Sequence, residues 1–316
     1  MTFARIIGTG SYMPERILTN ADLEQMVDTT DQWILDRTGI RERRIIAEDQ
    51  KVSDLAEIAA KRALEASGTK AADIDLVIVA SATSELIFPS LACLIQQRLG
   101  IGDCPAFDIN AACTGFIYQL DVANQFIKNG SAKNVLLVAA EGLSKVVDWD
   151  DRATCILFSD GAGAVVLTAD SKPGIRSTHI HADGTYNELL YAPSGRYGDD
   201  PPHIRMKGND VFKVAVVKLG SVVTEALQAN NLVVDDIDWL VPHQANLRII
   251  KATAKRIHLP MERVILTIEK QGNTSAASVP LALDTGVREG KIKAGDTVLM
   301  EAFGAGFTWG SALVDF

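Results

Sequence analysis

The amino-acid sequence predicts an α/β fold in which helices cover both faces of largely buried sheets. Two runs, 76–80 and 135–139, are apolar at every position, as expected of strands that are buried on both faces. Near these runs, the segments 52–66, 90–99 and 116–128 carry apolar residues at helical spacing. Strands and helices that alternate in this way are typical of sheets packed between layers of helices.

An internal repeat is the second observation behind this fold class. Three segments of the first half resemble segments of the second half, always at an offset of 163 residues. The pairs are 60–67 with 223–230, 73–77 with 236–240, and 134–137 with 297–300. A common offset indicates that a unit of about 150 residues was duplicated. We therefore expect an N-terminal half at residues 1–171 and a C-terminal half at 172–316, divided at a turn near 170–174.

Composition and charge disfavour several classes of function. The chain has 316 residues and a net charge of −9, which argues against general binding of nucleic acid. No run of about 18 apolar residues could span a membrane, and the N-terminus lacks the apolar core of a signal peptide. The four cysteines form no C-x-x-C pair and have no histidine at ligand spacing, so we expect free thiols and no metal site. These features predict a cytoplasmic protein.

The sequence around Cys113 is the strongest candidate for a reactive site. The stretch 110–116 reads NAACTGF and lies between a predicted strand, 105–109, and the predicted helix 116–128. The unpaired N–H groups and the partial positive charge at the start of a helix favour a thiolate over a thiol. The thiolate is the nucleophilic form of cysteine. The alternative is that Cys113 is a small apolar residue packed in the core.

Two polar residues lie in comparable turns of the second half. His243 follows the predicted strand 239–241 and precedes a predicted helix at 246–257. Asn273 is the counterpart of Asn110 at the offset of the repeat. Both side chains can donate hydrogen bonds, so they would complement a cysteine nucleophile. Alternatively, His243 helps to cap its helix and Asn273 caps the next one.

Three motifs together resemble the signatures of the β-ketoacyl-[acyl carrier protein] synthase III family. They are NAACTGF at 110–116, VPHQANLR at 241–248 and GNTSAAS at 272–278. WILDRTGI at 33–40 and FGAGFTWG at 303–310 resemble further motifs of the same family. The resemblance extends over essentially the whole chain. It implies a thiolase-like fold, in which two similar α/β halves form a five-layered α-β-α-β-α architecture, and this agrees with the repeat.

The resemblance implies an acyltransferase that catalyses a decarboxylative Claisen condensation. Cys113 would take the acyl group from a short acyl-CoA, above all acetyl-CoA, and malonyl-acyl carrier protein would supply the attacking carbanion. His243 and Asn273 would donate hydrogen bonds to the developing enolate. The backbone N–H groups of Cys113 and Ala305 would bind the oxyanion at Cys113, although the Cβ of Ala305 disfavours a positive φ. The product would be a 3-oxoacyl-acyl carrier protein, the first condensation of bacterial-type fatty acid synthesis, made without a cofactor or metal.

The same resemblance implies a site for CoA and an acyl pocket. Trp33 and Arg152 would flank the adenine, Arg37 would pair with a phosphate, and Asn246 would contact the pantetheine arm. Phe88 corresponds to a residue that reaches across the interface of a homodimer and closes the partner's acyl pocket, which favours short primers. Ordinary packing is the alternative for Trp33, and a place in the core is the alternative for Phe88.

A basic face on the predicted helix 246–257 is the expected docking site for the acidic acyl carrier protein. Its basic residues are Arg248, Lys251, Lys255 and Arg256. We place the recognition segment at Gln244, Ala245, Asn246, Leu247 and Arg248, with Lys213 as an extension of the same face. The alternative is a solvated basic face that binds no partner.

The residues alone leave other functions open. A chalcone synthase-like enzyme would use a CoA-bound extender with similar catalytic chemistry. A degradative thiolase usually has a second catalytic cysteine near its C-terminus, where this sequence has 306–311 without cysteine. A papain-like hydrolase also combines Cys, His and Asn but has no need of duplicated α/β units. A non-catalytic acyl-binding relative is a further alternative.

Overall fold

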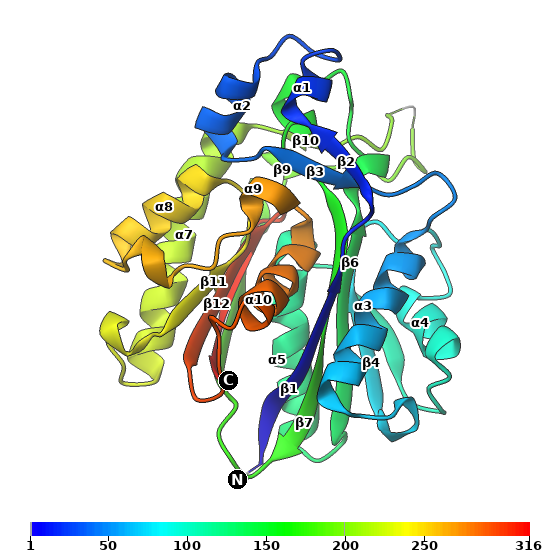
Figure 1. Ribbon diagram of the computed structural model, residues 1–316, viewed down its shortest axis with the longest axis vertical. Coiled ribbons are helices and arrows are strands. Elements are labelled where there is room, and N and C mark those ends of the chain that lie inside the picture. The colour runs from blue at the N-terminus through cyan, green and yellow to red at the C-terminus, as the bar shows by residue number, and fades with distance from the viewer. Residues whose placement is uncertain (1, 199) are drawn as a thin grey trace.

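The computed structural model describes residues 2–198 and 200–316 and places two sheets between three layers of helices (Figure 1). One sheet has the strand order β1-β7-β6-β4-β5. Its strands are β1 (Phe3–Tyr12), β4 (Leu76–Ala80), β5 (Ala106–Ile109), β6 (Asn134–Gly142) and β7 (Asp160–Asp170). β4 is parallel to β5 and β6, whereas β7 is antiparallel to β1 and β6. The apolar runs at 76–80 and 135–139 are therefore neighbouring strands, and they are buried as predicted.

The second sheet has the order β11-β12-β13-β8. Its strands are β8 (Ile175–Ala182), β11 (Trp239–Pro242), β12 (Thr297–Gly304) and β13 (Thr308–Asp315). β11 and β12 are parallel, and the other two pairings are antiparallel. The two sheets thus repeat a parallel pair that is followed by antiparallel neighbours.

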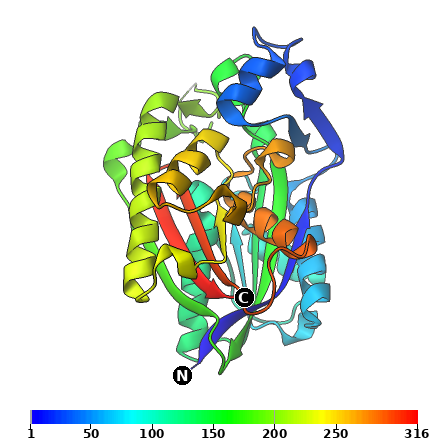
Figure 2. The ribbon, with the colours of Figure 1, turned by 60° about the vertical axis from the view of Figure 1, so that its left-hand side comes forward.

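The long helices cover and separate these sheets. α3 (Val52–Ser67) and α4 (Leu91–Leu99) pack on the outer face of the first sheet. α7 (Gly208–Ala229) and α8 (Leu247–Arg256) pack on the outer face of the second sheet, opposite α3 in both views (Figures 1 and 2). α5 (Gly115–Lys128) and α10 (Ser278–Arg288) lie between the sheets. This confirms the five-layered α-β-α-β-α arrangement.

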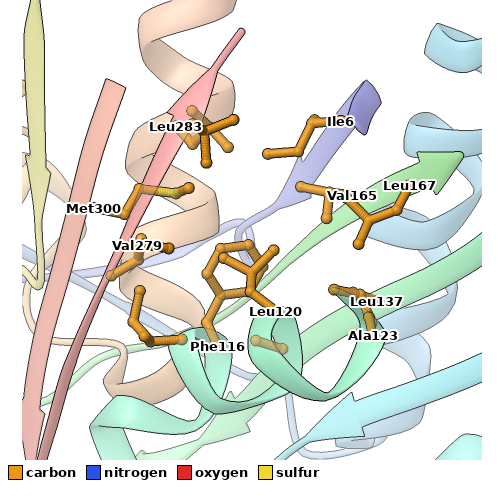
Figure 3. Close-up of a cluster of buried hydrophobic side chains, with 14 of the residues drawn as sticks. Ile6, Phe116, Leu120, Ala123, Leu137, Val165, Leu167, Val279, Leu283 and Met300 are labelled. Atoms are coloured by element: carbon orange, nitrogen blue, oxygen red, sulfur yellow. The ribbon is translucent and has the colours of Figure 1, made fainter. Parts of the chain in front are cut away.

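The central layer contains the largest part of the apolar core. Figure 3 shows Phe116 and Leu120 of α5 facing Val279 of α10, with Val165 and Met300 contributed by the two sheets. All of these side chains are excluded from solvent. Complete burial of a side chain of this size stabilises the fold by about 1.5–3 kcal/mol. This packing holds the start of α5 in place, and Cys113 lies directly before it.

The internal repeat is visible in the positions of the elements. Four pairs of elements begin 163 residues apart: β4 and β11, η2 (Ala112–Thr114) and η7 (Ser275–Ala277), α5 and α10, and β6 and β12. The two short 3₁₀ turns also share an unusual backbone, since φ is +46° at Ala112 and +49° at Ser275. The boundary predicted at residue 171 falls in the segment that joins β7 to β8, and the division into two folding units there stays a prediction.

Smaller elements form a cap at the top of the molecule in Figure 1. They are α1 (Asn20–Leu23), α2 (Asp31–Thr38), α6 (Arg152–Cys155) and α9 (Ile268–Gln271), with the strand pairs β2 (Arg16–Thr19) and β3 (Glu42–Ile45), and β9 (Leu190–Tyr191) and β10 (Arg205–Met206). Single 3₁₀ turns lie at 71–73, 143–145, 184–186, 234–236 and 261–263. The cap has an apolar cluster of its own, which includes Ile34, Ile40 and Ile156.

No helix within residues 2–198 and 200–316 combines the length and the apolar character that crossing a membrane requires.

Candidate active site

Two cavities meet at Cys113. The first has a volume of about 300 Å³ and is lined by Cys113, His243 and Asn273 together with residues of the cap and of α7 and α8. The second has a volume of about 650 Å³ and is lined by Cys113, Ser275 and Ala305 among others. The three residues that the sequence analysis singled out therefore face a common space, although they are up to 160 residues apart in the chain.

The turn that carries Cys113 is held by contacts from the second half. The side chain of Cys113 is 8% exposed, and Ala112 before it adopts a positive φ. Thr308 Oγ1 donates a hydrogen bond of 3.0 Å to the carbonyl of Ala111. At Gly304, an added Cβ would lie 2.8 Å from the backbone nitrogen of Cys113, so only glycine allows β12 to end this close to the nucleophile.

The electrostatic environment of Cys113 differs from the sequence-based expectation. Burial raises the pKa of the Cys113 thiol to about 12, and the nearby Glu141 carboxyl acts in the same direction. A hydrogen bond from Ser275 lowers the pKa of the thiol but does not compensate for burial. The predicted preference for a thiolate at the start of the helix is therefore wrong for the ligand-free protein. Desolvation of a charged sulfur outweighs the partial charge of a helix end.

His243 lies at the end of β11 and is anchored on both sides. Its N–H donates to the carbonyl of Glu301 at 2.8 Å, and its Nδ1 lies 2.5 Å from Oγ of Ser278. Burial lowers the pKa of His243 to about 3, so the ring is neutral at physiological pH. The alternative that His243 caps the next helix is wrong, because the side chain of Asn246 is the N-cap of α8 and accepts from the N–H of Arg248.

Asn273 is placed by both its backbone and its side chain. Its backbone N–H donates to the carbonyl of Leu157 and its carbonyl accepts from Ser159, each at 2.9 Å. The side-chain oxygen accepts from the N–H of Ser275 at 2.9 Å, so it supports the following turn. Asn273 is not the N-cap of α10, which is Ala277. In the described part of the chain the Nδ2 group has no protein acceptor, so it can donate into the first cavity.

The comparisons with known proteins agree with this geometry. Residues 107–184 match the family described as 3-Oxoacyl-[acyl-carrier-protein (ACP)] synthase III, and residues 227–316 match its C-terminal part. A β-ketoacyl-[acyl-carrier-protein] synthase III of Coxiella burnetii is 59% identical over 317 residues, which cover 99% of this chain and 99% of the relative. One of Xanthomonas campestris is 58% identical, covering 99% and 98%. The crystal structure of the Aquifex aeolicus 3-oxoacyl-[acyl-carrier-protein] synthase III superposes with a TM-score of 0.95 at 48% identity, covering 99% and 100%.

This chain belongs to the β-ketoacyl-[acyl-carrier-protein] synthase III family. Its members are condensing enzymes of the acyltransferase type with the thiolase fold, and this confirms the fold and the enzyme class that the sequence motifs predict.

In this synthase III, three residues that we predict to bind CoA lie together at the mouth of the first cavity. The guanidinium carbon of Arg37 is 4.6 Å from the centre of a Trp33 ring, and that of Arg152 is 4.8 Å from it. Nη1 of Arg152 also donates to the carbonyl of Asp28 at 2.6 Å. Because Arg152 already lies on the indole, an adenine can enter between these two residues only if the Arg152 side chain moves.

One residue of the predicted recognition segment of the synthase is misplaced in our sequence analysis. Gln244 is fully buried, and its amide donates to the carbonyls of Pro242 and Ile265 at 2.8 and 3.2 Å. Its side-chain oxygen accepts from the N–H groups of Thr267 and Ile268 at 3.0 Å. Gln244 therefore braces the turn from inside and its side chain cannot contact a docked protein. A glutamine is usually exposed, so only the tertiary structure reveals this role.

The other members of the docking set differ in how accessible they are. Ala245, Asn246 and Leu247 are partly exposed, and Leu247 packs against Gly39 of the cap. The side chains on the basic face of α8 are all exposed; they are Arg248, Lys251, Lys255 and Arg256. Lys213 is exposed as well and pairs with Asp210 at 3.2 Å.

Phe88 has no place in the core, so that alternative is wrong. The residue is 82% exposed, and its neighbours Leu86 and Ile87 are exposed as well. The preceding residues 82–85 line the second cavity, whereas Phe88 itself does not. An apolar segment of this kind on the surface is typical of an interaction site.

The end of β12 resolves the expectation about Ala305. The positive φ in this segment belongs to Gly306, at +137°, and Ala305 is not among the described residues with a positive φ. Within the described ranges, neither the N–H of Cys113 nor that of Ala305 donates a hydrogen bond to a protein group. A Cβ at position 305 is therefore compatible with an N–H that faces the second cavity.

Sequence reasoning missed the hydroxyl groups that support the site. Ser278 contacts the ring of His243, and Ser275 contacts both Cys113 and Glu141. The carboxyl of Glu141 is buried and also accepts from the backbone of Ala82 and the side chain of Thr83. The repeat contained a signal for Ser275, since it is the counterpart of Ala112 in the nucleophile turn. Across residues 2–198 and 200–316, no cluster of three or more His, Cys, Asp or Glu side chains is arranged to hold a metal ion.

Proposed function

We propose that the chain joins a short acyl-CoA primer, acetyl-CoA above all, to malonyl-acyl carrier protein and releases CO₂ and CoA. Membership of the synthase III family supports the initiating condensation of fatty acid synthesis as its reaction. The observation that carries the catalytic assignment is the cavity that Cys113, His243 and Asn273 line together. A thiol and two neutral donors around one space suit an acyl-enzyme mechanism.

In the first half-reaction the sulfur of Cys113 attacks the thioester carbon of the acyl-CoA. A bond forms between this sulfur and the acyl carbon, the bond to the CoA sulfur breaks, and the thiol proton ends on the departing CoA. The free N–H groups of Cys113 and Ala305 are the proposed donors to the oxyanion of the tetrahedral intermediate. Loss of one such donor typically costs about 3 kcal/mol of transition-state stabilisation.

In the second half-reaction the malonyl group loses CO₂, and the electron pair of the broken C–C bond forms an enolate. His243 and Asn273 are proposed to donate to the enolate oxygen, which supports carbanion formation without placing a negative charge beside it. The neutral ring of His243 and the unpaired Nδ2 of Asn273 suit this role. The enolate carbon then attacks the acyl-enzyme, a C–C bond forms, and the sulfur of Cys113 is released.

The remaining assignments concern binding. Trp33, Arg37, Arg152 and Asn246 are proposed to bind CoA, since all four line or border the first cavity. Arg248, Lys251, Lys255 and Arg256 form a basic face beside the same opening, where an acidic carrier protein would dock. We further propose a homodimer in which the exposed Phe88 closes the acyl pocket of the other subunit, a cytoplasmic location, and a reaction that uses no metal or cofactor.

Labelled acetyl-CoA tests the acyl-enzyme directly. We expect the label on Cys113, located by mass spectrometry of a proteolytic digest, and no label in the Cys113→Ser variant. That variant should still decarboxylate malonyl-acyl carrier protein, because His243 and Asn273 are intact. Label on another residue would reject the assigned nucleophile. Replacing malonyl-acyl carrier protein with malonyl-CoA should abolish condensation in the wild type, and efficient use of malonyl-CoA would instead indicate an enzyme that extends CoA-bound substrates.

A further inference from the structure

Arg43 on β3 is a charged side chain buried in the cap. It is the largest fully buried side chain among the described residues, and it has no carboxylate within ion-pair distance there. Burial lowers the pKa of the guanidinium to about 10, so it stays charged at neutral pH. Placing an unpaired charge in a protein interior is unfavourable unless several hydrogen bonds compensate for the lost water. The fold therefore retains Arg43 against a free-energy cost.

The guanidinium of Arg43 is hydrogen bonded in two directions. Its Nε and Nη2 donate to the carbonyl of Ile156 at 3.0 and 2.5 Å. Its Nη1 donates to the side-chain oxygen of Asn20 and, at 3.5 Å, to the carbonyl of Arg41. A planar guanidinium presents fixed donors along several directions, which an ammonium group cannot reproduce.

Ile156 connects Arg43 to one side of the proposed CoA site. It is the C-cap of α6, the short helix that begins with Arg152. Two hydrogen bonds from Arg43 to a single carbonyl therefore fix the end of the element that carries Arg152.

Asn20 connects Arg43 to the other side of that site. Its Nδ2 group donates to the carboxylate of Asp31 at 2.7 Å and to the carbonyl of Ile40 at 2.9 Å. Asp31 is the first residue of α2, and Ile40 follows the C-cap of that helix. Both ends of the helix that carries Trp33 and Arg37 are thus tied to the same buried network.

We propose that Arg43 is a positioning residue that holds α2 against α6 and thereby sets the slot for the nucleotide end of the CoA thioester. This inference rests on the proposed function, because it assigns Trp33, Arg37 and Arg152 to CoA. Arg43 lines neither of the two cavities that meet at Cys113, so it acts on the binding of the nucleotide and leaves the chemical step unchanged.

Two acyl donors separate these effects: acetyl-CoA, and S-acetylpantetheine, which contains the reacting thioester but lacks the nucleotide. In Arg43→Lys, KM for acetyl-CoA should rise about tenfold, as expected from weakened stacking and phosphate contacts, with kcat nearly unchanged. kcat/KM for S-acetylpantetheine should stay at the wild-type value. Asn20→Ala interrupts the same network at its other end and should give the same pattern; it decides the matter if Arg43→Lys does not fold. Arg41→Gln is the matched control, since Arg41 pairs with Glu269 at the surface.

Three results would overturn the inference. An equal loss of activity with both donors would show that Arg43 supports the site as a whole, and wild-type KM values in both variants would show that the network does not affect CoA binding. If the wild-type protein transferred acetyl groups from neither donor, the proposed function itself would fail, and the inference with it. Calorimetric titration with CoA alone gives a readout independent of turnover, and we expect weaker binding in Arg43→Lys than in Arg41→Gln.

Discussion

The hydroxyl of Ser278 lies 2.5 Å from Nδ1 of His243, at the point where α10 begins. The N–H of Gln244 donates to the same hydroxyl oxygen at 3.3 Å. An oxygen that already accepts from this N–H is well placed to donate its own proton to Nδ1. The proton of the neutral ring would then reside on Nε2, where a donor to the enolate is required.

Removal of this hydroxyl should affect the two half-reactions differently. Ser278→Ala should lower the rate of malonyl-acyl carrier protein decarboxylation about tenfold to a hundredfold, because the ring loses its preferred tautomer. Acyl transfer from acetyl-CoA to Cys113 should change little. Single-turnover assays of the two steps check this prediction. Thr285→Ala, which removes another hydroxyl of α10 away from the ring, is the control. Equal losses in both steps would contradict the assigned role.

The raised pKa of Cys113 predicts slow and strongly pH-dependent alkylation. With a thiol pKa of about 12, the thiolate fraction is small at pH 7. The rate of modification by iodoacetamide should therefore rise about tenfold for each pH unit between 7 and 9. Mass spectrometry of the peptide that contains residue 113 gives this rate, with Cys113→Ser as the blank. A rate that levels off near neutral pH would mean that the helix start does stabilise a thiolate.

Glu301 on β12 should make the stability of the fold depend on pH. Burial raises the pKa of its carboxyl from 4.5 to about 8, and within the described chain neither carboxyl oxygen has a hydrogen-bond partner. The folded state thus holds a proton that the unfolded chain releases. The associated stability is complete below about pH 4.5 and is lost as the pH rises towards 8.

Glu301→Gln removes this titration. At pH 8 the variant should be more stable than the wild type by about 1–3 kcal/mol, and at pH 5 the two should be similar. Urea unfolding at several pH values measures the difference. The control is Glu289→Gln, because Glu289 is half exposed and pairs with Lys291 at the surface. A difference that does not grow with pH would show that Glu301 finds a partner in solution.

The basic face of α8 predicts a selective effect on the carrier protein. Arg248→Ala should raise KM for malonyl-acyl carrier protein several-fold, because an exposed charge at a docking site contributes about 0.2–1 kcal/mol and steers the encounter. KM for acetyl-CoA should stay close to the wild-type value. Arg263→Ala, at an exposed arginine that borders Asp235, is the matched control. An effect confined to acetyl-CoA would assign Arg248 to the CoA site instead.

Much of the fold could be predicted from local patterns. The apolar runs at 76–80 and 135–139 identified buried strands because a strand enclosed on both faces has no polar position. The repeat offset identified Asn273 as the counterpart of Asn110, and each accepts a hydrogen bond from the N–H two residues further on. The motifs around Cys113 and His243 sufficed to identify the family.

The tertiary structure alone decided how these residues are surrounded. Gln244 reads as a surface residue, yet four backbone groups from two segments enclose its amide. Cys113 begins a helix, yet burial between the two halves controls its pKa. Periodicity and repeats are recorded along the chain, so the sequence determined the elements and the chemistry of the site. Burial and hydrogen-bond geometry depend on segments that are distant in sequence, so only the packed fold could decide which groups are charged, paired or accessible.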